Sequence, residues 1–369
     1  MPEKFPLGSK EFIEKRHELE LPAVEVRNRV RHVNPAFKEA PFRLQEGEPT
    51  PLGLFFTPDE QTHDHSEVKH MVIAPEWRSG RAGSLHPIIF RDTDGNVYRD
   101  VDIKGMGAFK RVEEGKDSFI VHEPRPMEKE VTYASTYGIL DRRVAEYDEK
   151  RSEELIRAGI RTYRIIGIAD LKEVINKDGE KISINEAKKQ GLIPDFMEPA
   201  LEFRAYGTRE RIEYLRDKTE RSRLAIEDAK KMVAVELGRK PEDFSTNEYA
   251  QWYTKTLGQQ LAKLKKYGLY HGYLHYHNLT LDCRIVDLDS VNELAEVSKQ
   301  KNESEESLHE YDIHGALMNL MELWDYLGLE EKEKTLCFDL YEEAYEQELK
   351  HKERMRKAFM FLHKKLRGK

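Results

Sequence analysis

The sequence predicts an α+β protein with a small β-rich N-terminal lobe and a larger helical C-terminal lobe. Short β-branched runs separated by turn residues fill residues 71–178, and longer stretches with a helical apolar repeat dominate residues 179–369. A chain of 369 residues is also long enough for two compact bodies. Residues 1–70 are polar and rich in Pro, Glu and His, so we expect an N-terminal extension there, with a short helix over KEFIEKRHELE and the rest either an irregular arm or a packed extension.

Four runs carry the strand signal of the N-terminal lobe: MVIAP, HPIIF, VYRDVDI and SFIVHEP. Asp94 and Gly95 stand between two of them, and an Asp-Gly pair in that position predicts a β-hairpin. A helix is expected over about 136–158, where Ala158 and Gly159 form a suitable C-terminal cap. TYRIIGIADL then predicts one more strand.

The C-terminal lobe is predicted from four helical patterns. They are INEAKKQG, the segment from TRERIEYL to KKMVAVEL, NEYAQWYTKTLGQQLAKLKKYG, and residues 305–365. A loop over residues 269–290 interrupts them. Its short runs and polar residues differ from the helices on both sides.

Composition limits the cellular environments and the classes of partner that we expect for this protein. The net charge is −8, so no global basic field favours nucleic acid. The two cysteines, Cys283 and Cys337, form no CxxC pair, which indicates a reducing compartment. The N-terminus has no apolar core, and no stretch approaches 18 apolar residues. We expect a cytoplasmic protein without a membrane or nucleic-acid partner.

A strand lysine is the first candidate for phosphate chemistry. Lys104 lies in DIKGMG, where residues alternate as in a strand before two glycines, although a surface lysine before a turn is the alternative. A phosphate-binding lysine of this kind is held by an acid from a neighbouring helix, and the candidates are Asp148, Glu149 and Glu153. If Leu155 faces the core, Asp148 faces nearly the same way, with Glu149 about 100° around the helix. The choice among them stays open.

Three arginines form the second candidate. Arg204, Arg209 and Arg211 lie within eight residues, and arginine binds phosphate through a forked pair of donors. Ion pairing with the neighbouring glutamates is the alternative.

The loop HGYLHYHNLTLDCRIVDLD is the third candidate. Asn278 and Asp287 lie nine residues apart, in a pattern that fits a β-hairpin bringing both to one divalent cation. Mg²⁺ takes a few such oxygens together with phosphate oxygens and waters. Asp289 is a possible second acid, and Cys283 is expected to be a small core residue. A strand pair with incidental polar ends is the alternative.

A histidine zinc site competes with this interpretation. His271, His275 and His277 cluster in the loop, and THDHSEVKH supplies three more histidines. The glycine and the loop character of residues 271–278 do not give the regular helical HxxxH geometry of zinc proteases, and the other histidines lie in the N-terminal extension. We therefore favour Mg²⁺.

Taken together, these segments resemble selenoprotein O, the pseudokinase family that transfers AMP from ATP to protein hydroxyls. The loop has the family's nine-residue step from Asn278 to Asp287, and Tyr273 stands where kinases carry their catalytic aspartate. RSGR and DIKGMG are similar to the family's LGDGR and QLKGAG segments. SEELIRAGIRTYR is similar to its helix leading into GIPTTR, and RAYGTRER to its RVAPSxxR. The resemblance is remote and covers roughly residues 75–290.

The resemblance implies a bilobal protein-kinase-like fold that binds ATP with Mg²⁺, or with Mn²⁺ as an alternative ion. It implies that Gly80 and Arg81 contact the nucleotide. Lys104, paired with Asp148 or Glu149, would contact phosphate, and Arg204 together with Arg211 or Arg209 would clamp the phosphates of an ATP bound in inverted orientation. Asn278 and Asp287 would hold the metal. His277 replaces the family's proposed base, an aspartate. Histidine can act as a base near neutral pH, but the change is equally compatible with loss of activity.

The resemblance implies AMP transfer to a Ser, Thr or Tyr hydroxyl of a protein substrate. Two alternatives stay open. One is an atypical protein or small-molecule kinase, since HGYLHYHN is also similar to the HGDLHPGN of small-molecule kinases, although Tyr273 replaces their aspartate. The other is a catalytically silent pseudokinase that binds nucleotide or partner proteins.

Overall fold

The computed structural model describes residues 19–37, 43–73, 79–85, 88–111, 119–121, 138–216 and 218–349. It is a mixed α+β structure, as the sequence predicts, and its main sheet is antiparallel. The chain forms two compact units. Unit 1 contains Met1–Glu153 and Tyr163–Arg209, and unit 2 contains Glu154–Thr162 and Glu210–Lys369.

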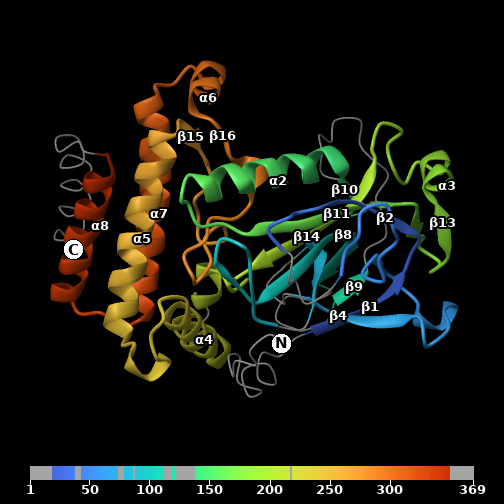
Figure 1. Ribbon diagram of the computed structural model, residues 1–369, viewed down its shortest axis with the longest axis horizontal. Coiled ribbons are helices and arrows are strands. Elements are labelled where there is room, and N and C mark those ends of the chain that lie inside the picture. The colour runs from blue at the N-terminus through green and yellow to red at the C-terminus, as the bar shows by residue number, and fades with distance from the viewer. Residues whose placement is uncertain are drawn as a thin grey trace. The chain divides into compact units, whose positions relative to one another are not determined.

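Unit 1 is built on a 10-stranded sheet in which neighbouring strands run antiparallel. The strand order is β2-β11-β14-β8-β5-β4-β1-β3, with β10 on β14 and β9 on β8. The strands are β1 (Leu19–Glu25), β2 (Asn28–Val33), β3 (Leu54–Phe56), β4 (Val68–Ile73), β5 (Ser79–Ser84), β8 (Asp100–Arg111), β9 (Phe119–Val121), β10 (Leu140–Asp141), β11 (Arg164–Leu171) and β14 (Pro199–Tyr206). Helix α2 (Arg142–Arg157) runs along β11 and β14 (Figure 1).

Smaller elements complete unit 1. They are the 3₁₀ turn η1 (Glu60–Thr62), the pair β6 (Phe90–Arg91) and β7 (Val97–Tyr98), the pair β12 (Glu173–Ile175) and β13 (Lys181–Ser183), and helix α3 (Ile184–Lys189). The β6–β7 hairpin confirms the prediction made from Asp94-Gly95. The predicted helix over 136–158 is α2, and TYRIIGIADL forms β11.

For the described part of residues 1–70, the irregular-arm alternative is wrong, and the chain there is a packed extension. Strands β1, β2 and β3, and the start of β4, belong to the main sheet, and most of KEFIEKRHELE lies outside the described residues. Strand β2 explains the error, because its residues alternate between buried and exposed at an edge of the sheet. An edge strand with one solvated face has a polar composition, so composition alone resembled a loop.

Residues 179–209, expected in the helical lobe, lie with the sheet of unit 1. All eight residues of β14 are buried between β11 and β8. Two of them, Glu202 and Arg204, are charged, and these charges disguised a central strand. Central strands of a sheet covered on both faces normally read as continuous apolar runs.

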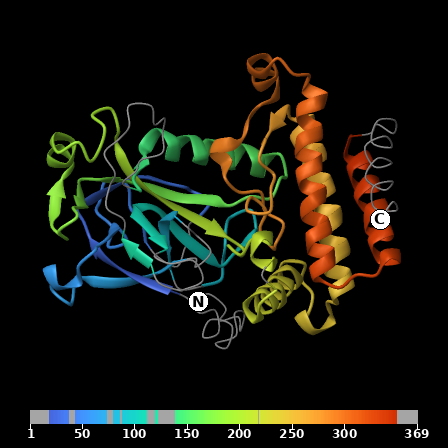
Figure 2. The same cartoon turned by 180° about the vertical axis from the view of Figure 1, so that it is seen from behind.

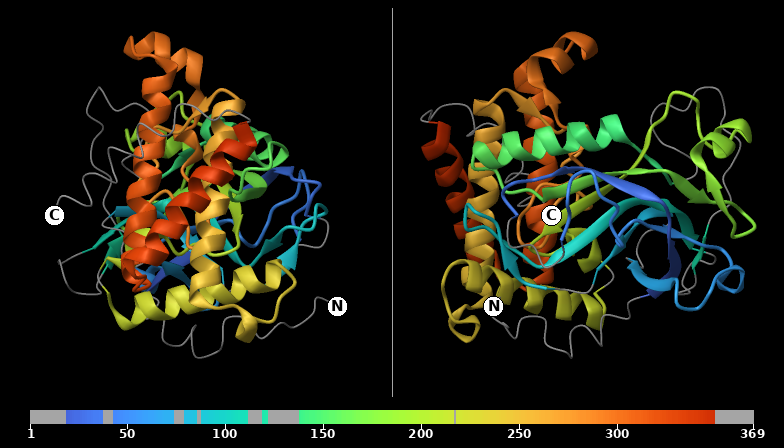
Figure 3. Two further views of the ribbon diagram at one scale, coloured as in Figure 1. Left: turned by 90° about the vertical axis from the view of Figure 1, so that its left-hand side faces the viewer. Right: turned by 45° about the vertical axis from the view of Figure 1, so that its right-hand side comes forward.

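Unit 2 is mainly helical. Its elements are η2 (Ile212–Leu215), α4 (Glu220–Glu236), η3 (Pro241–Asp243), α5 (Thr246–Lys266), β15 (Leu269–Tyr270), η4 (Leu288–Ser290), β16 (Asn292–Glu293), α6 (Leu294–Lys301), α7 (Glu305–Tyr326) and α8 (Glu331–Leu349). Helices α5, α7 and α8 lie side by side in every view (Figures 1, 2 and 3). The indole of Trp324 on α7 packs edge-on against Phe338 of α8 and donates a hydrogen bond to Thr254 of α5.

Local chemistry explains where these helices begin. Ser245 and Glu248 form a reciprocal capping box at the start of α5, and Thr219 and Ser222 do the same for α4. The helical pattern over 305–365 divides into α7 and α8, and the rest of it lies outside the described residues. Within the described ranges, no helix combines the length and the apolarity needed to cross a membrane.

Candidate functional site

Lys104 and Asp148 form a buried ion pair in unit 1. Lys104 lies on β8, between Glu202 of β14 and Ala82 of β5 in the sheet register. Its Nζ is 3.0 Å from Oδ2 of Asp148 on α2, and the two residues are 6% and 0% exposed. The same carboxylate oxygen accepts a hydrogen bond of 3.3 Å from the hydroxyl of Tyr163.

The other two acidic candidates on α2 have different partners. Glu149 pairs with Nε2 of His32, and Glu153 pairs with Arg164. The choice that the sequence left open therefore falls on Asp148 as the partner of Lys104. Among the described residues, the second oxygen of Asp148, Oδ1, accepts no hydrogen bond.

Two glycines after Lys104 allow β8 to approach its neighbours closely. Gly105 has a φ of +99°, and a Cβ there would lie 2.5 Å from the carbonyl oxygen of Ala200. Gly107 has a φ of +96°, and its Cβ would contact the ring of Phe55. The glycines of DIKGMG therefore shape the strand beside Lys104 instead of forming a loop.

The arginine candidates divide between the two units. Arg204 on β14 is buried, with its guanidinium 3.6 Å from Asp102 and 3.7 Å from Glu202, over the rings of Tyr163 and Tyr206. Burial opposes its charge, but Tyr206, Glu202 and Asp102 together raise the pKa of Arg204. Its pairing with acids follows the alternative interpretation made from the sequence.

Arg209 and Arg211 lie on either side of the boundary between the units. Arg209 belongs to unit 1, where it donates a hydrogen bond to the hydroxyl of Ser84 and lies 3.7 Å from Asp102. Arg211 belongs to unit 2, where it donates to the carbonyl oxygen of His277. Within unit 1, Arg204 and Arg209 therefore share a cluster around Asp102.

Gly80 and Arg81 lie on β5, next to β8. The register shifts between Gly80 and Ala82, which places Arg81 at a β-bulge with a partly buried side chain. Bulges redirect side chains and are frequent beside functional sites.

The loop of unit 2 is held by an acid that the sequence did not single out. Asp312 on α7 accepts hydrogen bonds of 2.8 Å from the backbone N–H groups of His271 and Gly272, one on each carboxylate oxygen. Burial raises the pKa of Asp312, although His271 and these two hydrogen bonds oppose the effect. The ring of His271 contacts the carbonyl oxygen of Val286 at 2.8 Å. Asp312 lies 41 residues from His271, and no local pattern in the sequence connects them.

Asn278 is fixed inside the same loop. The side-chain amide Nδ2 of Asn278 donates a hydrogen bond of 2.8 Å to the carbonyl oxygen of Tyr273. The main-chain carbonyl oxygen of Asn278 accepts a hydrogen bond of 3.1 Å from the N–H of Val286. Within the described part of the chain, the side-chain oxygen of Asn278 accepts no hydrogen bond. Residues 278–287 form a tight hydrogen-bonded turn with a bridge between Leu279 and Ile285, a shorter form of the predicted hairpin.

Asp287 ends this turn in a left-handed conformation, with φ 67° and ψ 56°. Its side chain is exposed, and its contact is a weak hydrogen bond of 3.4 Å from the hydroxyl of Ser290. A non-glycine residue in this backbone region is uncommon and often has a functional reason. An amide oxygen and a carboxylate are ligands that Mg²⁺ accepts, so Asn278 and Asp287 fit this ion in chemical type.

The histidines of the loop do not converge. Among the described residues, no group of three or more His, Cys, Asp or Glu side chains could hold a metal ion together. His277 is partly buried, and burial lowers the pKa of its ring. Tyr273 is 58% exposed, and its contribution to the loop is the main-chain carbonyl that holds Asn278.

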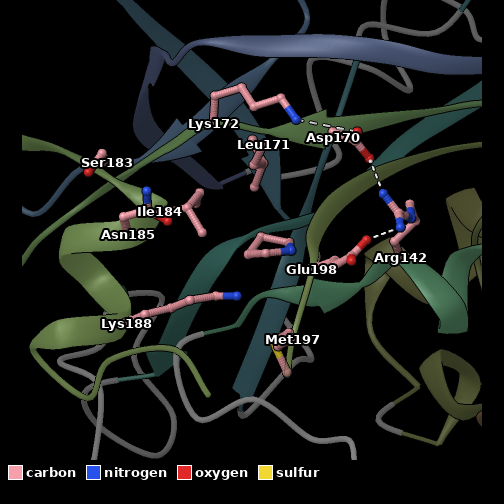
Figure 4. Close-up of a pocket in the computed structure, with 11 residues that line it drawn as sticks. Arg142, Asp170, Leu171, Lys172, Ser183, Ile184, Asn185, Lys188, Met197 and Glu198 are labelled. Carbon is pink, nitrogen blue, oxygen red and sulfur yellow. Dashed lines mark hydrogen bonds and ion pairs between the residues drawn. The ribbon is translucent and has the colours of Figure 1, made fainter. Parts of the chain in front are cut away.

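Unit 1 also contains a hollow of about 400 Å³ beside α3 (Figure 4). Its cationic residues already have partners. Arg142 pairs with Asp170 and Glu198, Lys172 lies 3.4 Å from Asp170, and Lys188 donates to the carbonyl oxygen of Asp195. We therefore assign no ligand to this hollow.

A scan with protein-family models found no match to this chain, and a search of curated proteins found none with significant similarity.

Proposed function

We propose that this protein is an ATP- and Mg²⁺-dependent transferase on a protein-kinase-like scaffold, with units 1 and 2 as its two lobes. The observation that carries the proposal is the buried pair of Lys104 and Asp148. A strand lysine paired with an acid from an adjacent helix is the arrangement with which protein kinases hold the phosphates of ATP. Burying two charges is rarely worthwhile for stability alone, which favours a functional reason for the pair.

The proposed reaction is transfer of AMP to a protein hydroxyl, as the resemblance to selenoprotein O implies. The hydroxyl oxygen attacks the α-phosphorus, the bond from that phosphorus to the bridging oxygen breaks, and pyrophosphate leaves. His277, whose pKa is lowered by burial, would accept the proton of the hydroxyl. Lys104 would neutralise charge on the phosphates.

Asn278 and Asp287 would hold Mg²⁺, which would supply charge neutralisation on the phosphates when bound. The loop is prepared for this role in two ways. Asp312 fixes its backbone at His271 and Gly272, and Tyr273 orients the amide of Asn278. The side chain of Tyr273 has no part in the proposed chemistry, in accordance with its exposure.

A silent nucleotide-binding pseudokinase is the second candidate, favoured by one specific observation. Arg204 is engaged by Asp102 and Glu202, so it would have to leave these acids to clamp a phosphate. The two candidates differ in turnover, because only the transferase forms a covalent product.

Parallel incubations with α-labelled and γ-labelled ATP test the proposal, with protein extract as acceptor. AMP transfer places the α label on protein and leaves the γ label in pyrophosphate. Lys104→Met and Asp287→Asn are expected to abolish labelling, whereas the matched controls Lys172→Met and Asp195→Asn, both at exposed positions, retain it. Transfer of the γ label alone would establish a kinase instead, and MgATP binding without any transfer would establish the silent pseudokinase.

A further inference from the structure

An acidic turn in unit 1 encloses the guanidinium of Arg164. The turn joins β6 to β7, and its first residue, Asp92, accepts backbone N–H groups of Asp94 and Asn96 at 2.9 Å each. The other oxygen of Asp92 accepts 2.6 Å from Nη1 of Arg164 and 3.0 Å from the hydroxyl of Tyr98. The same Nη1 donates 2.7 Å to Asp94.

The opposite edge of the guanidinium holds helix α2. Nε and Nη2 of Arg164 donate to the two oxygens of Glu153 at 2.7 and 2.8 Å, a bidentate pair. Glu153 also accepts 2.7 Å from the amide of Asn34, which follows β2. Arg164 is 5% exposed, so one buried cation links the turn, strand β11 and helix α2.

Helix α2 presents two acidic faces to the sheet. Glu149 and Glu153 lie one turn apart, and both have polar partners, His32 for the first and Arg164 for the second. On the adjoining face, Ser152 donates 2.7 Å to the carbonyl oxygen of Tyr163, and Asp148 meets Lys104. Glu153 follows Asp148 by five residues, less than two helical turns, and a helix is rigid over that length, so a fixed Glu153 determines the direction in which Asp148 points.

The direction of the Asp148 side chain depends on such a contact because apolar packing alone leaves a helix some freedom to rotate and slide. A forked pair of charge-assisted hydrogen bonds has one geometry and removes that freedom. Hydrogen bonds from Asn96 and Arg164 keep the pKa of Asp92 below its usual value, although burial opposes this, so the turn stays anionic near neutral pH.

We propose that Arg164, together with Asp92 and Glu153, is a positioning device that orients α2 so that Asp148 holds Lys104 in place. Arg164 touches neither nucleotide nor metal in this proposal and acts through the Lys104–Asp148 pair. Its effect on ATP binding rests on the proposed function, whereas its effect on the Lys104–Asp148 pair does not.

The first test compares MgATP affinities by titration calorimetry in the full chain. Arg164→Lys keeps the charge but loses the fork, and we expect it to weaken MgATP binding about tenfold. The matched control is Arg143→Lys, because Arg143 on α2 makes a similar forked pair with Asp141 of β10 but has an exposed side chain. We expect the control to leave the affinity unchanged. The double variant Arg164→Lys/Lys104→Met should bind MgATP no more weakly than Lys104→Met alone. If the losses of affinity from the two single substitutions multiply in the double variant, the proposal is refuted.

The second test needs no nucleotide. The coupling between Lys104→Met and Asp148→Asn is measured in a double-mutant cycle, from hydrogen exchange of β8 and α2 peptides in urea. We expect this coupling to fall at least threefold in the Arg164→Lys background and to persist in the Arg143→Lys background. Glu153→Gln, a milder change in the same network, should act like Arg164→Lys.

The two tests separate the possible failures. If Arg164→Lys lowers stability but leaves the Lys104–Asp148 coupling intact, Arg164 is merely structural and the proposal is wrong. If the coupling falls but the unaltered protein binds no MgATP, the positioning role stands and the proposed function is wrong.

Discussion

The substitution Asp148→Asn probes the buried pair most directly. It removes the negative charge from a fully buried carboxylate and leaves Lys104, which is 6% exposed, without its partner at 3.0 Å. Breaking a buried ion pair from one side typically destabilises a protein by about 3–5 kcal/mol. The lower end applies here, since Glu202 lies opposite Lys104 in the register of β14 and β8 and offsets part of its charge. We therefore expect a loss of about 3 kcal/mol in unit 1.

The cycle with Lys104→Met gives this prediction its control. Lys104→Met alone leaves Asp148 with the hydroxyl of Tyr163 as a hydrogen-bond donor. We expect a loss of about 1–2 kcal/mol. The double variant removes both charges, and its loss should be about 2 kcal/mol smaller than the sum of the single losses, within the usual range of coupling energies.

The assay must report on unit 1 alone, because unfolding of two units need not be a single transition. Hydrogen exchange of peptides from β8 and α2, followed over a series of urea concentrations, meets this requirement. Additive losses in the double variant would refute the inference that Lys104 and Asp148 stabilise each other. A loss below about 1 kcal/mol for Asp148→Asn would show that Lys104 has another sufficient partner.

Three further predictions concern other parts of the chain. His309 is buried against the hydroxyl of Tyr345, and burial lowers its pKa to about 3. The unfolded chain therefore takes up a proton that the folded state excludes, so the free energy of unfolding of unit 2 should fall by about 1.4 kcal/mol for each unit of pH lowered between pH 6.5 and 3. His309→Phe should flatten this pH dependence, as measured by the fluorescence of Trp252 and Trp324 in urea. Asp312→Ala should speed hydrogen exchange at His271 and Gly272 and reduce label transfer at least tenfold. The control is Asp325→Ala, which changes an exposed residue of the same helix α7 that pairs with Lys334 of α8; it should change neither quantity. Gly105→Ala should destabilise unit 1 by about 3 kcal/mol or more, since its Cβ would meet a backbone oxygen, and Gly95→Ala, which has open space at a similar φ, by about 1 kcal/mol, as judged from hydrogen exchange of unit 1 peptides in urea.

The candidate site was predictable from the sequence as residue types and incompletely as contacts. Lys104 was identified because a lysine in an alternating run before two glycines has a recognisable pattern, and β8 confirms the strand. Its partner was one of three acids on a single helix, and rotation about the helix axis was decided by contacts from β2 and β11. Arg204 was identified as a possible phosphate ligand, but its neighbours across the sheet, Asp102 and Glu202, depend on strand order.

Local pattern by itself determined the elements whose signals lie within a few residues. The Asp-Gly turn between β6 and β7, the capped helix α5, the strand β11 and the helix α2 all follow from neighbouring residues, because turn, cap and periodicity are short-range properties. Tertiary structure alone decided the rest. It placed the polar N-terminal strands in the main sheet, buried the charged strand β14 at its centre, and brought Asp312 to His271 across 41 residues. In each case the partner that satisfies a charge or a backbone group lies far away in the chain, and no local pattern specifies which distant partner a side chain meets.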